Sequence, residues 1–96
     1  MGNKGVFLIA VKVNLPGFSE YYLKGLKEAE VEGSKVDEVL HQLMNKYPKL
    51  KLLDRKGKLL SHLGIYVNGE IIYPEEFDRS VQDGDELSIV MMFDGG

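Results

Sequence analysis

The sequence predicts a small α+β domain in which a mixed sheet of four to five strands packs on one main helix. A central stretch has apolar residues at the three- and four-residue spacing of a helix, and the stretches before and after it alternate apolar and polar residues as strands do. One helix of about three to four turns covers one face of a small sheet and no more. Ninety-six residues suffice for one domain with its own core.

Two strands are expected before the helix. Apolar residues occupy every second position of the first, and they are Phe7, Ile9, Val11, Val13 and Leu15. Pro16 and Gly17 end this strand, and a loop follows. The second strand is expected over residues 27–32, where three glutamates alternate with Ala29 and Val31, so one of its faces is exposed.

The helix is predicted to begin after Ser34, an N-cap residue, and to end at Pro48. Asp37 and Glu38 lie in its first turn, where negative charge complements the helix dipole. A single apolar stripe runs along the helix and consists of Val36, Val39, Leu40, Leu43, Met44 and Tyr47. This stripe is expected to pack on the sheet.

Three more strands are expected after the helix. Residues 63–67 form the first of them, and Asn68-Gly69 is a strong hairpin signal that makes residues 70–73 a short return strand. The last strand is expected over residues 86–94. Strand, strand, helix, strand, short strand and strand is the order of the β-grasp, or ubiquitin-like, architecture.

Charge is unevenly distributed along the chain, whose net charge is −3. Residues 46–58 hold six bases and one acid, with no interleaved aromatic residue beyond Tyr47, so they indicate a solvated loop and not a nucleic-acid partner. Residues 70–96 hold eight acids and one base. We expect these acids to surround the end of the chain and to steer it toward a basic partner.

Several classes of function are excluded by composition. The chain has no cysteine, so it has no disulfide scaffold, thiolate metal site or cysteine nucleophile. His41 lies off the apolar stripe and His62 has no partner motif, so neither is expected to be catalytic. The first apolar run is too short for a signal peptide or a membrane span. A cytoplasmic protein without a membrane partner, a metal or a bound cofactor is expected.

Gly95 and Gly96 end the chain directly after the last predicted strand. Glycine has no Cβ, so an extended pair can pass through a slot too narrow for a side chain and leaves the terminal carboxylate open to attack. We expect residues 1–92 to form the folded domain and residues 93–96 to form a flexible tail. The competing interpretation is a frayed end without a role.

Four short motifs carry a family resemblance over nearly the whole chain. They are Val36-Asp-Glu-Val-Leu40 with Tyr47-Pro48, Val67-Asn-Gly-Glu70, Asp83-Gly-Asp-Glu86 and the terminal Gly95-Gly96. Together they resemble the ubiquitin-like sulfur carriers, the family of the molybdopterin synthase small subunit (MoaD) and ThiS. Each motif is weak alone, and their order and spacing make the set specific.

The resemblance implies that the chemistry takes place at Gly96. An adenylating enzyme of the ubiquitin-activating, MoeB/ThiF-like type would use ATP to join the Gly96 carboxylate to AMP, and a sulfur donor would then convert it to a thiocarboxylate. An acceptor enzyme, such as the molybdopterin synthase large subunit or thiazole synthase, would take the sulfur. The chain itself would be a carrier and co-substrate, with catalysis in its partners.

The branch of the family stays open. Met91-Met92 stand where the molybdopterin branch commonly has two prolines, and residues 49–61 are longer than a typical ThiS connection. The sequences of residues 73–77 and 81–85 resemble those of the ThiS branch more closely. We expect molybdenum or tungsten cofactor synthesis. The alternatives are thiamine thiazole synthesis or tRNA thiolation, a protein modifier conjugated through Gly96, and a plain interaction domain.

Apolar residues are also expected on the face of the sheet that the helix does not cover. They lie at even-numbered positions of three strands and are Val6, Leu8, Ala10, Tyr66, Val90 and Met92. A cluster of this kind next to the tail predicts a docking surface. The tail residues Phe93, Asp94 and Gly95 would take part in the same contact.

Overall fold

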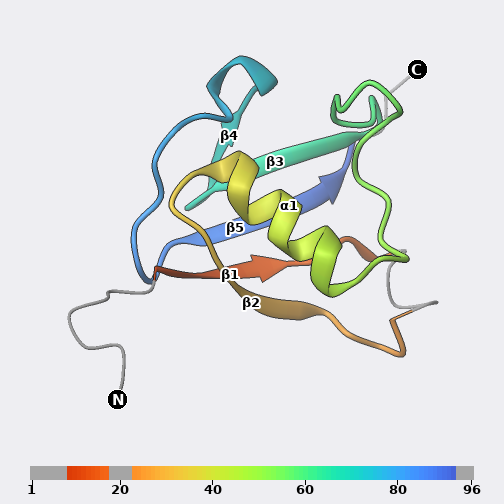
Figure 1. Ribbon diagram of the computed structural model, residues 1–96, viewed down its shortest axis with the longest axis horizontal. Helices are drawn as coiled ribbons and strands as arrows, with labels where there is room; N and C mark the ends of the chain where they lie inside the picture. Colours follow the sequence, from red (N-terminus) through yellow and green to blue (C-terminus); the bar gives the residue numbers. More distant parts are fainter. Residues whose placement is uncertain (1–8, 18–22, 93–96) are drawn as a thin grey trace.

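The computed structural model describes residues 9–17 and 23–92, in which one α-helix packs across one face of a five-stranded sheet (Figure 1). The elements in chain order are β1 (Ala10–Asn14), β2 (Glu28–Glu32), α1 (Val36–Lys46), β3 (Leu63–Val67), β4 (Glu70–Ile72), the 3₁₀ turn η2 (Pro74–Glu76) and β5 (Glu86–Met91). The order of elements confirms the predicted β-grasp fold. The division into a domain of residues 1–92 and a tail of residues 93–96 stays a prediction, because the tail lies outside the described ranges.

The strands lie in the order β2-β1-β5-β3-β4. β1 and β5 are parallel neighbours at the centre, with Val13 opposite Leu87, and the other three pairings are antiparallel. A parallel pair needs a long crossover connection, and here the crossover contains α1 together with the β3–β4 hairpin. The first and last strands of the chain therefore lie side by side in the middle of the sheet.

The core lies between the sheet and α1. Odd-numbered residues of the central strands are buried there, as the alternation predicts, and they are Val11, Val13, Leu63, Ile65, Val67, Leu87 and Ile89. The predicted helix stripe is confirmed as well, since its first four members are buried and Met44 and Tyr47 pack on the core while partly exposed. Even-numbered residues of β1, β3 and β5 consequently point away from the helix, whereas in β4 the even-numbered Ile72 is in the core and Ile71 points away.

The predicted N-cap at Ser34 is wrong. Lys35 precedes the first helical residue, and no side chain caps the helix. The backbone N–H groups of Val36 and Asp37 donate instead to carbonyl groups of the segment after η2, at 3.1 and 2.9 Å. Because this tertiary contact satisfies two of the free donors of the first turn, Ser34 is available for another contact.

Ser34 binds the acid that follows it in the helix. Its backbone N–H and its hydroxyl both donate to Glu38 Oε1 at 2.8 Å. These two hydrogen bonds stabilise the carboxylate and lower the pKa of Glu38 below its usual value. The sequence therefore identifies the start of the helix correctly but assigns Ser34 the wrong partner.

The basic stretch before β3 is more ordered than the predicted solvated loop. Leu50 and Leu52 are buried in the core, while the charged residues between and after them are exposed. Asp54 fixes the tip of the loop, because its carboxylate accepts hydrogen bonds from the backbone N–H groups of Lys56 and Lys58 at 2.8 and 2.9 Å. The alternation of lysine and leucine over residues 49–52 is a signal that could have revealed this half-buried segment.

The hairpin at Asn68-Gly69 is confirmed. Both residues have positive φ, 51° and 86°, which is the conformation of a type I′ turn and the reason that Asn-Gly is favoured there. The return strand ends at Ile72, one residue earlier than predicted. β5 ends at Met91, so the predicted continuation of this strand through residues 93 and 94 falls outside the described residues.

Candidate functional site

The outer face of the sheet, on the side opposite α1, holds the predicted docking residues that the structure describes. Ala10, Tyr66 and Val90 are partly exposed there, and Met92 just after β5 is 40% exposed. The predicted parity of these strands is therefore confirmed. Val6, Leu8 and the tail residues Phe93, Asp94, Gly95 and Gly96 lie outside the described residues.

One half of this face is apolar and lies over β3, β4 and the end of β5. We define this apolar half by Gly64, Tyr66, Ile71, Tyr73, Val90 and Met92. Tyr66 stands opposite Ile71, and Gly64 stands opposite Val90, so these residues are direct neighbours. Tyr73, 54% exposed, and Met92 are the most exposed large apolar side chains of the described chain.

A groove of about 300 Å³ lies at the border of the apolar half, next to the segment that precedes β3. Gly64, Ile71, Tyr73 and Met92 of the apolar half line it together with Leu59 and Leu60, and the core residues Leu63, Ile65 and Ile72 reach it as well. Sequence reasoning missed Ile71 and Tyr73 as members of this surface. The hairpin register could have revealed Ile71, because a type I′ turn at Asn68-Gly69 sets it opposite Tyr66.

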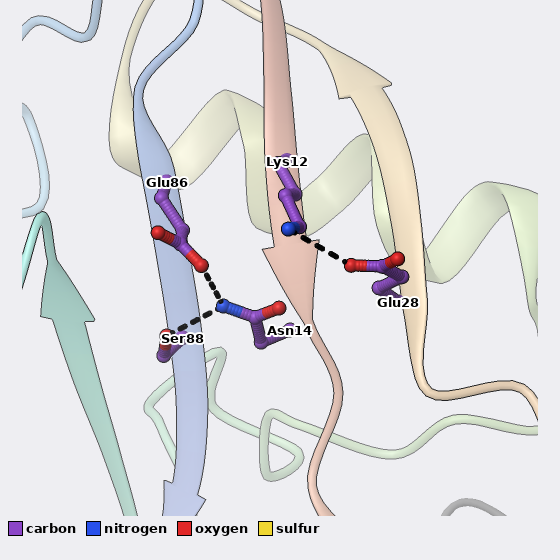
Figure 2. Close-up of polar contacts among 5 residues, drawn as sticks. All are labelled: Lys12, Asn14, Glu28, Glu86 and Ser88. Atoms are coloured by element: carbon purple, nitrogen blue, oxygen red, sulfur yellow. Dashed lines mark hydrogen bonds and ion pairs between the residues drawn. The ribbon is translucent and has the colours of Figure 1, made fainter.

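The other half of the outer face is polar and lies over β2, β1 and the start of β5. We define this polar half by Lys12, Asn14, Glu28, Glu86 and Ser88, which Figure 2 shows on the sheet with α1 behind it. In the described part of β1, Lys12 and Asn14 lie on this face after Ala10. Val6 and Leu8, the other residues of the first strand predicted for the apolar surface, lie outside the described residues, so their part stays a prediction.

The side chains of the polar half form an ion pair and hydrogen bonds with one another. Lys12 Nζ lies 3.1 Å from Glu28 Oε1, and this hydrogen-bonded ion pair raises the pKa of Lys12. Asn14 Nδ2 donates to Glu86 Oε2 at 2.6 Å and to Ser88 Oγ at 3.0 Å (Figure 2). Each of these side chains gains a partner within the chain, whereas the side chains of the apolar half gain only partial burial.

Met92, the last described residue, lies in the apolar half. The Met92 N–H donates to the His62 carbonyl at 2.7 Å and continues the β5–β3 pairing by one residue. The four residues that end in Gly96 follow directly. The tail therefore begins at the edge of the apolar half, which is the arrangement that the sequence predicts for a docking surface and a reactive terminus.

The acids expected around the tail lie partly elsewhere. Asp83, Asp85 and Glu86 precede or begin β5, whereas the tail follows its other end. A six-residue strand is roughly 20 Å long. These three acids therefore lie about a strand length from Met92, the last described residue, while the expectation that acids surround the tail concerns residues outside the described ranges and stays a prediction.

The described residues form neither a metal site nor a membrane-spanning helix. Within residues 9–17 and 23–92, there is no group of three or more histidines, cysteines or acids that could hold a metal ion. The same residues include no helix with the length and hydrophobicity needed to cross a membrane. His41 is exposed with Nδ1 2.8 Å from the Asp37 carbonyl oxygen, and His62 is exposed as well.

Comparison with known proteins gives consistent matches over most of the chain. The model of the ThiS family matches residues 18–96. A protein of Archaeoglobus fulgidus, described as a candidate sulfur carrier, is 35% identical over an alignment of 92 residues that covers 92% of this chain and all of that protein.

Solved structures give the same result. Small archaeal modifier protein 1 of Methanosarcina acetivorans is 30% identical, with a TM-score of 0.75 over 95% of this chain and all of that one. A chain of the BexX/CysO complex of Amycolatopsis orientalis is 28% identical, with a TM-score of 0.73 over 90% of this chain and 99% of that one.

Proposed function

Because this chain belongs to the ThiS/MoaD family of ubiquitin-like sulfur carriers, we propose that it carries sulfur as a thiocarboxylate on Gly96 for molybdenum or tungsten cofactor synthesis. The observation that supports this most directly is the position of the apolar half, which lies where the chain continues into Gly95-Gly96. Catalysis would reside in the partner enzymes.

The proposed reaction has two steps. A Gly96 carboxylate oxygen attacks the α-phosphorus of ATP on the activating enzyme, and pyrophosphate leaves. A hydrosulfide ion then attacks the carbonyl carbon of this acyl adenylate, AMP leaves with the bonding electron pair, and loss of the sulfur-bound proton gives the thiocarboxylate. We expect both steps in the cytoplasm. Gly95 and Gly96 suit them because neither carries a side chain that would hinder the approach.

The apolar half would dock on both the activating enzyme and the acceptor enzyme. Tyr66, Val90 and Met92 are the described contact residues, and Leu8, Phe93, Asp94 and Gly95 complete the proposed surface. Burial of an apolar side chain contributes roughly 1.5–3 kcal/mol before the loss of translational and rotational freedom is subtracted. A few such residues give binding that is specific but reversible, as a carrier with two successive partners requires.

Removal of Gly96 tests the proposal. Gly96 lies beyond the last residue that packs on the described core, so the shortened chain should melt like the original. ATP–pyrophosphate exchange with the activating enzyme of the same organism should be abolished, and so should exchange by a chain extended by one residue. If the shortened chain still supports exchange at the original rate, the terminal chemistry is wrong. A large drop in melting temperature would instead mean that the tail belongs to the fold.

A second candidate function is conjugation to lysine residues of other proteins. The 30% identity to small archaeal modifier protein 1 over nearly the whole chain favours it. Both functions begin with the same activated carboxylate, so mass spectrometry of protein from the native host is the test that separates them. Replacement of one oxygen by sulfur at the C-terminal peptide indicates the carrier. Gly-Gly remnants on lysines of other proteins indicate the modifier.

The sulfur-transfer pathway needs a separate test. A thiocarboxylated chain should release its sulfur when it is mixed with the molybdopterin synthase large subunit and the molybdopterin precursor on which that enzyme acts. Transfer to thiazole synthase or to a tRNA-thiolating enzyme would replace the proposed pathway with one of the alternatives. A chain with neither thiocarboxylate nor conjugates would be a plain interaction domain.

A further inference from the structure

A short hairpin before β3 carries three exposed bases at its tip. It spans residues 53–59, and an antiparallel bridge between Leu53 and Leu59 closes it. Gly57 has a φ of 82°, and its N–H donates to the Asp54 carbonyl at 3.0 Å, as in a turn that ends in a left-handed residue. We name this segment the basic hairpin after its three bases, which are Arg55, Lys56 and Lys58.

The three bases are not what orders the basic hairpin. The Asp54 carboxylate accepts hydrogen bonds from two backbone N–H groups of the turn, at 2.8 and 2.9 Å, and Leu53 and Leu59 pack against the core. Among the described residues, none of the three bases forms an ion pair. The hairpin therefore presents positive charge on an ordered backbone, which loses little freedom when a partner binds.

The basic hairpin lies beside the groove at the border of the apolar half. Leu59, its last residue, lines this groove together with Leu60 and Met92. Two residues further along, the His62 carbonyl accepts a hydrogen bond from the Met92 N–H at 2.7 Å. In Figure 1 this segment lies next to the end of β5. A partner that covers the apolar half and enters the groove therefore approaches the basic hairpin as well.

Charges of opposite sign lie elsewhere around the apolar half. The acids at residues 83–86 precede or begin β5, about a strand length from Met92. Glu75 and Glu76 of η2 follow Pro74, which lines the groove from the side of β4. The groove thus has bases on the side of the segment before β3 and acids on the side of η2, so its surroundings favour one orientation of a charged partner.

We propose that the basic hairpin docks against an acidic surface of the activating enzyme, next to the apolar surface that receives the apolar half. This inference rests on the function proposed above, because that function supplies the partner. Charges at the rim of an interface act mainly on the association rate. A nucleic acid fits less well, since the whole chain has a net charge of −3 and would be repelled by a polyanion.

Neutralisation of the basic hairpin tests the inference. Arg55→Gln/Lys56→Gln/Lys58→Gln removes the three charges and keeps the backbone N–H groups that bind Asp54. At about 20 mM NaCl, association with the activating enzyme, followed by stopped flow, should be about tenfold slower than for the original chain. At about 0.5 M NaCl the difference should fall below about twofold, because the Debye length is then about 4 Å. The dissociation rate and the melting temperature should change little.

Two controls separate the position of the charge from its amount and from side-chain shape. The first control has the same net charge as the neutralised hairpin and should associate within about twofold of the original chain at both salt concentrations. It changes three exposed lysines that flank β2, at the edge of the sheet away from β3 and β4, and is Lys24→Gln/Lys27→Gln/Lys35→Gln. The second control keeps the charge and changes the shape. It is Arg55→Lys/Lys56→Arg/Lys58→Arg, and it should associate like the original chain.

The outcomes distinguish this inference from the proposed function. If the original chain does not bind the activating enzyme, both are wrong. If activation depends on Gly96 but the neutralised hairpin associates as fast as the original chain or the lysine control at low salt, only the docking role is wrong. Slower association of the neutralised hairpin, together with exchange that does not depend on Gly96, would keep the docking role and overturn the terminal chemistry.

A nucleic-acid partner would also overturn the inference. A fluorescent DNA duplex of about 20 base pairs should not bind the original chain at about 0.15 M NaCl, as measured by anisotropy. Binding that is lost in the neutralised hairpin would assign the three bases to nucleic acid instead of the activating enzyme.

Discussion

The two halves of the outer face belong to one sheet and meet the same solvent, yet they have opposite chemistry. In the polar half, Lys12 pairs with Glu28, and Asn14 binds Glu86 and Ser88. In the apolar half, Tyr73 and Met92 remain exposed because one helix covers only the other face. The polar half is complete in the monomer, whereas the apolar half gains most from a partner.

Position along β5 adds a second difference. Glu86 of the polar half begins the strand, and Met92 of the apolar half follows its end, from which the tail continues. A partner that covers the apolar half is therefore next to the tail, and one that covers the polar half is a strand length away. The comparison predicts that changes of equal size in the two halves have unequal effects on binding.

The largest difference is expected between Val90→Asp and Ser88→Asp. A carboxylate at residue 90 would be desolvated among apolar side chains in the complex, so binding to the activating enzyme should weaken about a hundredfold, or by about 2.7 kcal/mol. A carboxylate at residue 88 meets Asn14 Nδ2, which already donates to Ser88 Oγ, so it should weaken binding far less. Titration calorimetry and thermal melting of both variants give the comparison.

Equal losses of affinity for Val90→Asp and Ser88→Asp would remove the distinction between the two halves. If Val90→Asp unfolds, Val90 belongs to the core and not to the docking surface. Leu8 lies outside the described residues. If the first strand extends the apolar half, Leu8→Asp should weaken binding to the activating enzyme about as much as Val90→Asp does.

A smaller effect is expected for Tyr73→Ala. Loss of an exposed aromatic side chain at the edge of the groove should weaken binding about tenfold, or by about 1.4 kcal/mol, with little change in melting temperature. Glu75→Ala, two residues along in an exposed turn, is the control and should bind like the original chain. Unchanged affinity after Tyr73→Ala would place the contact elsewhere on the apolar half.

The smallest effect is expected for Lys12→Ala, which should leave affinity for the activating enzyme unchanged. The ion pair with Glu28 raises the pKa of Lys12, so its contribution to stability is complete below the usual lysine pKa of about 10.4 and is lost as the pH rises past the raised pKa. The difference in melting temperature between Lys12→Ala and the original chain should therefore shrink between pH 7 and pH 11.5. A difference that grows over this range would contradict the assigned pairing, and weaker binding would give the polar half a role in docking.

Local patterns were sufficient where neighbouring residues decide the structure. The helix stripe, the type I′ turn at Asn68-Gly69 and the alternation of β5 depend on spacing within a few residues, and all are confirmed. Ser34 shows the limit of this reasoning. Its side chain is of the capping type, but carbonyl groups forty or more residues away accept hydrogen bonds from the first turn of the helix.

The sequence by itself determined the fold class, the helix-facing parity of the strands and the glycine pair on which the proposed chemistry depends, because each is set by residue type and periodicity. Only the tertiary structure decided which strands are neighbours. That order sets the β3–β4 hairpin, with Ile71 and Tyr73, beside the end of β5 and lays Met92 on Gly64. Gly64 and Met92 are distant in the chain, and no local pattern specifies their contact.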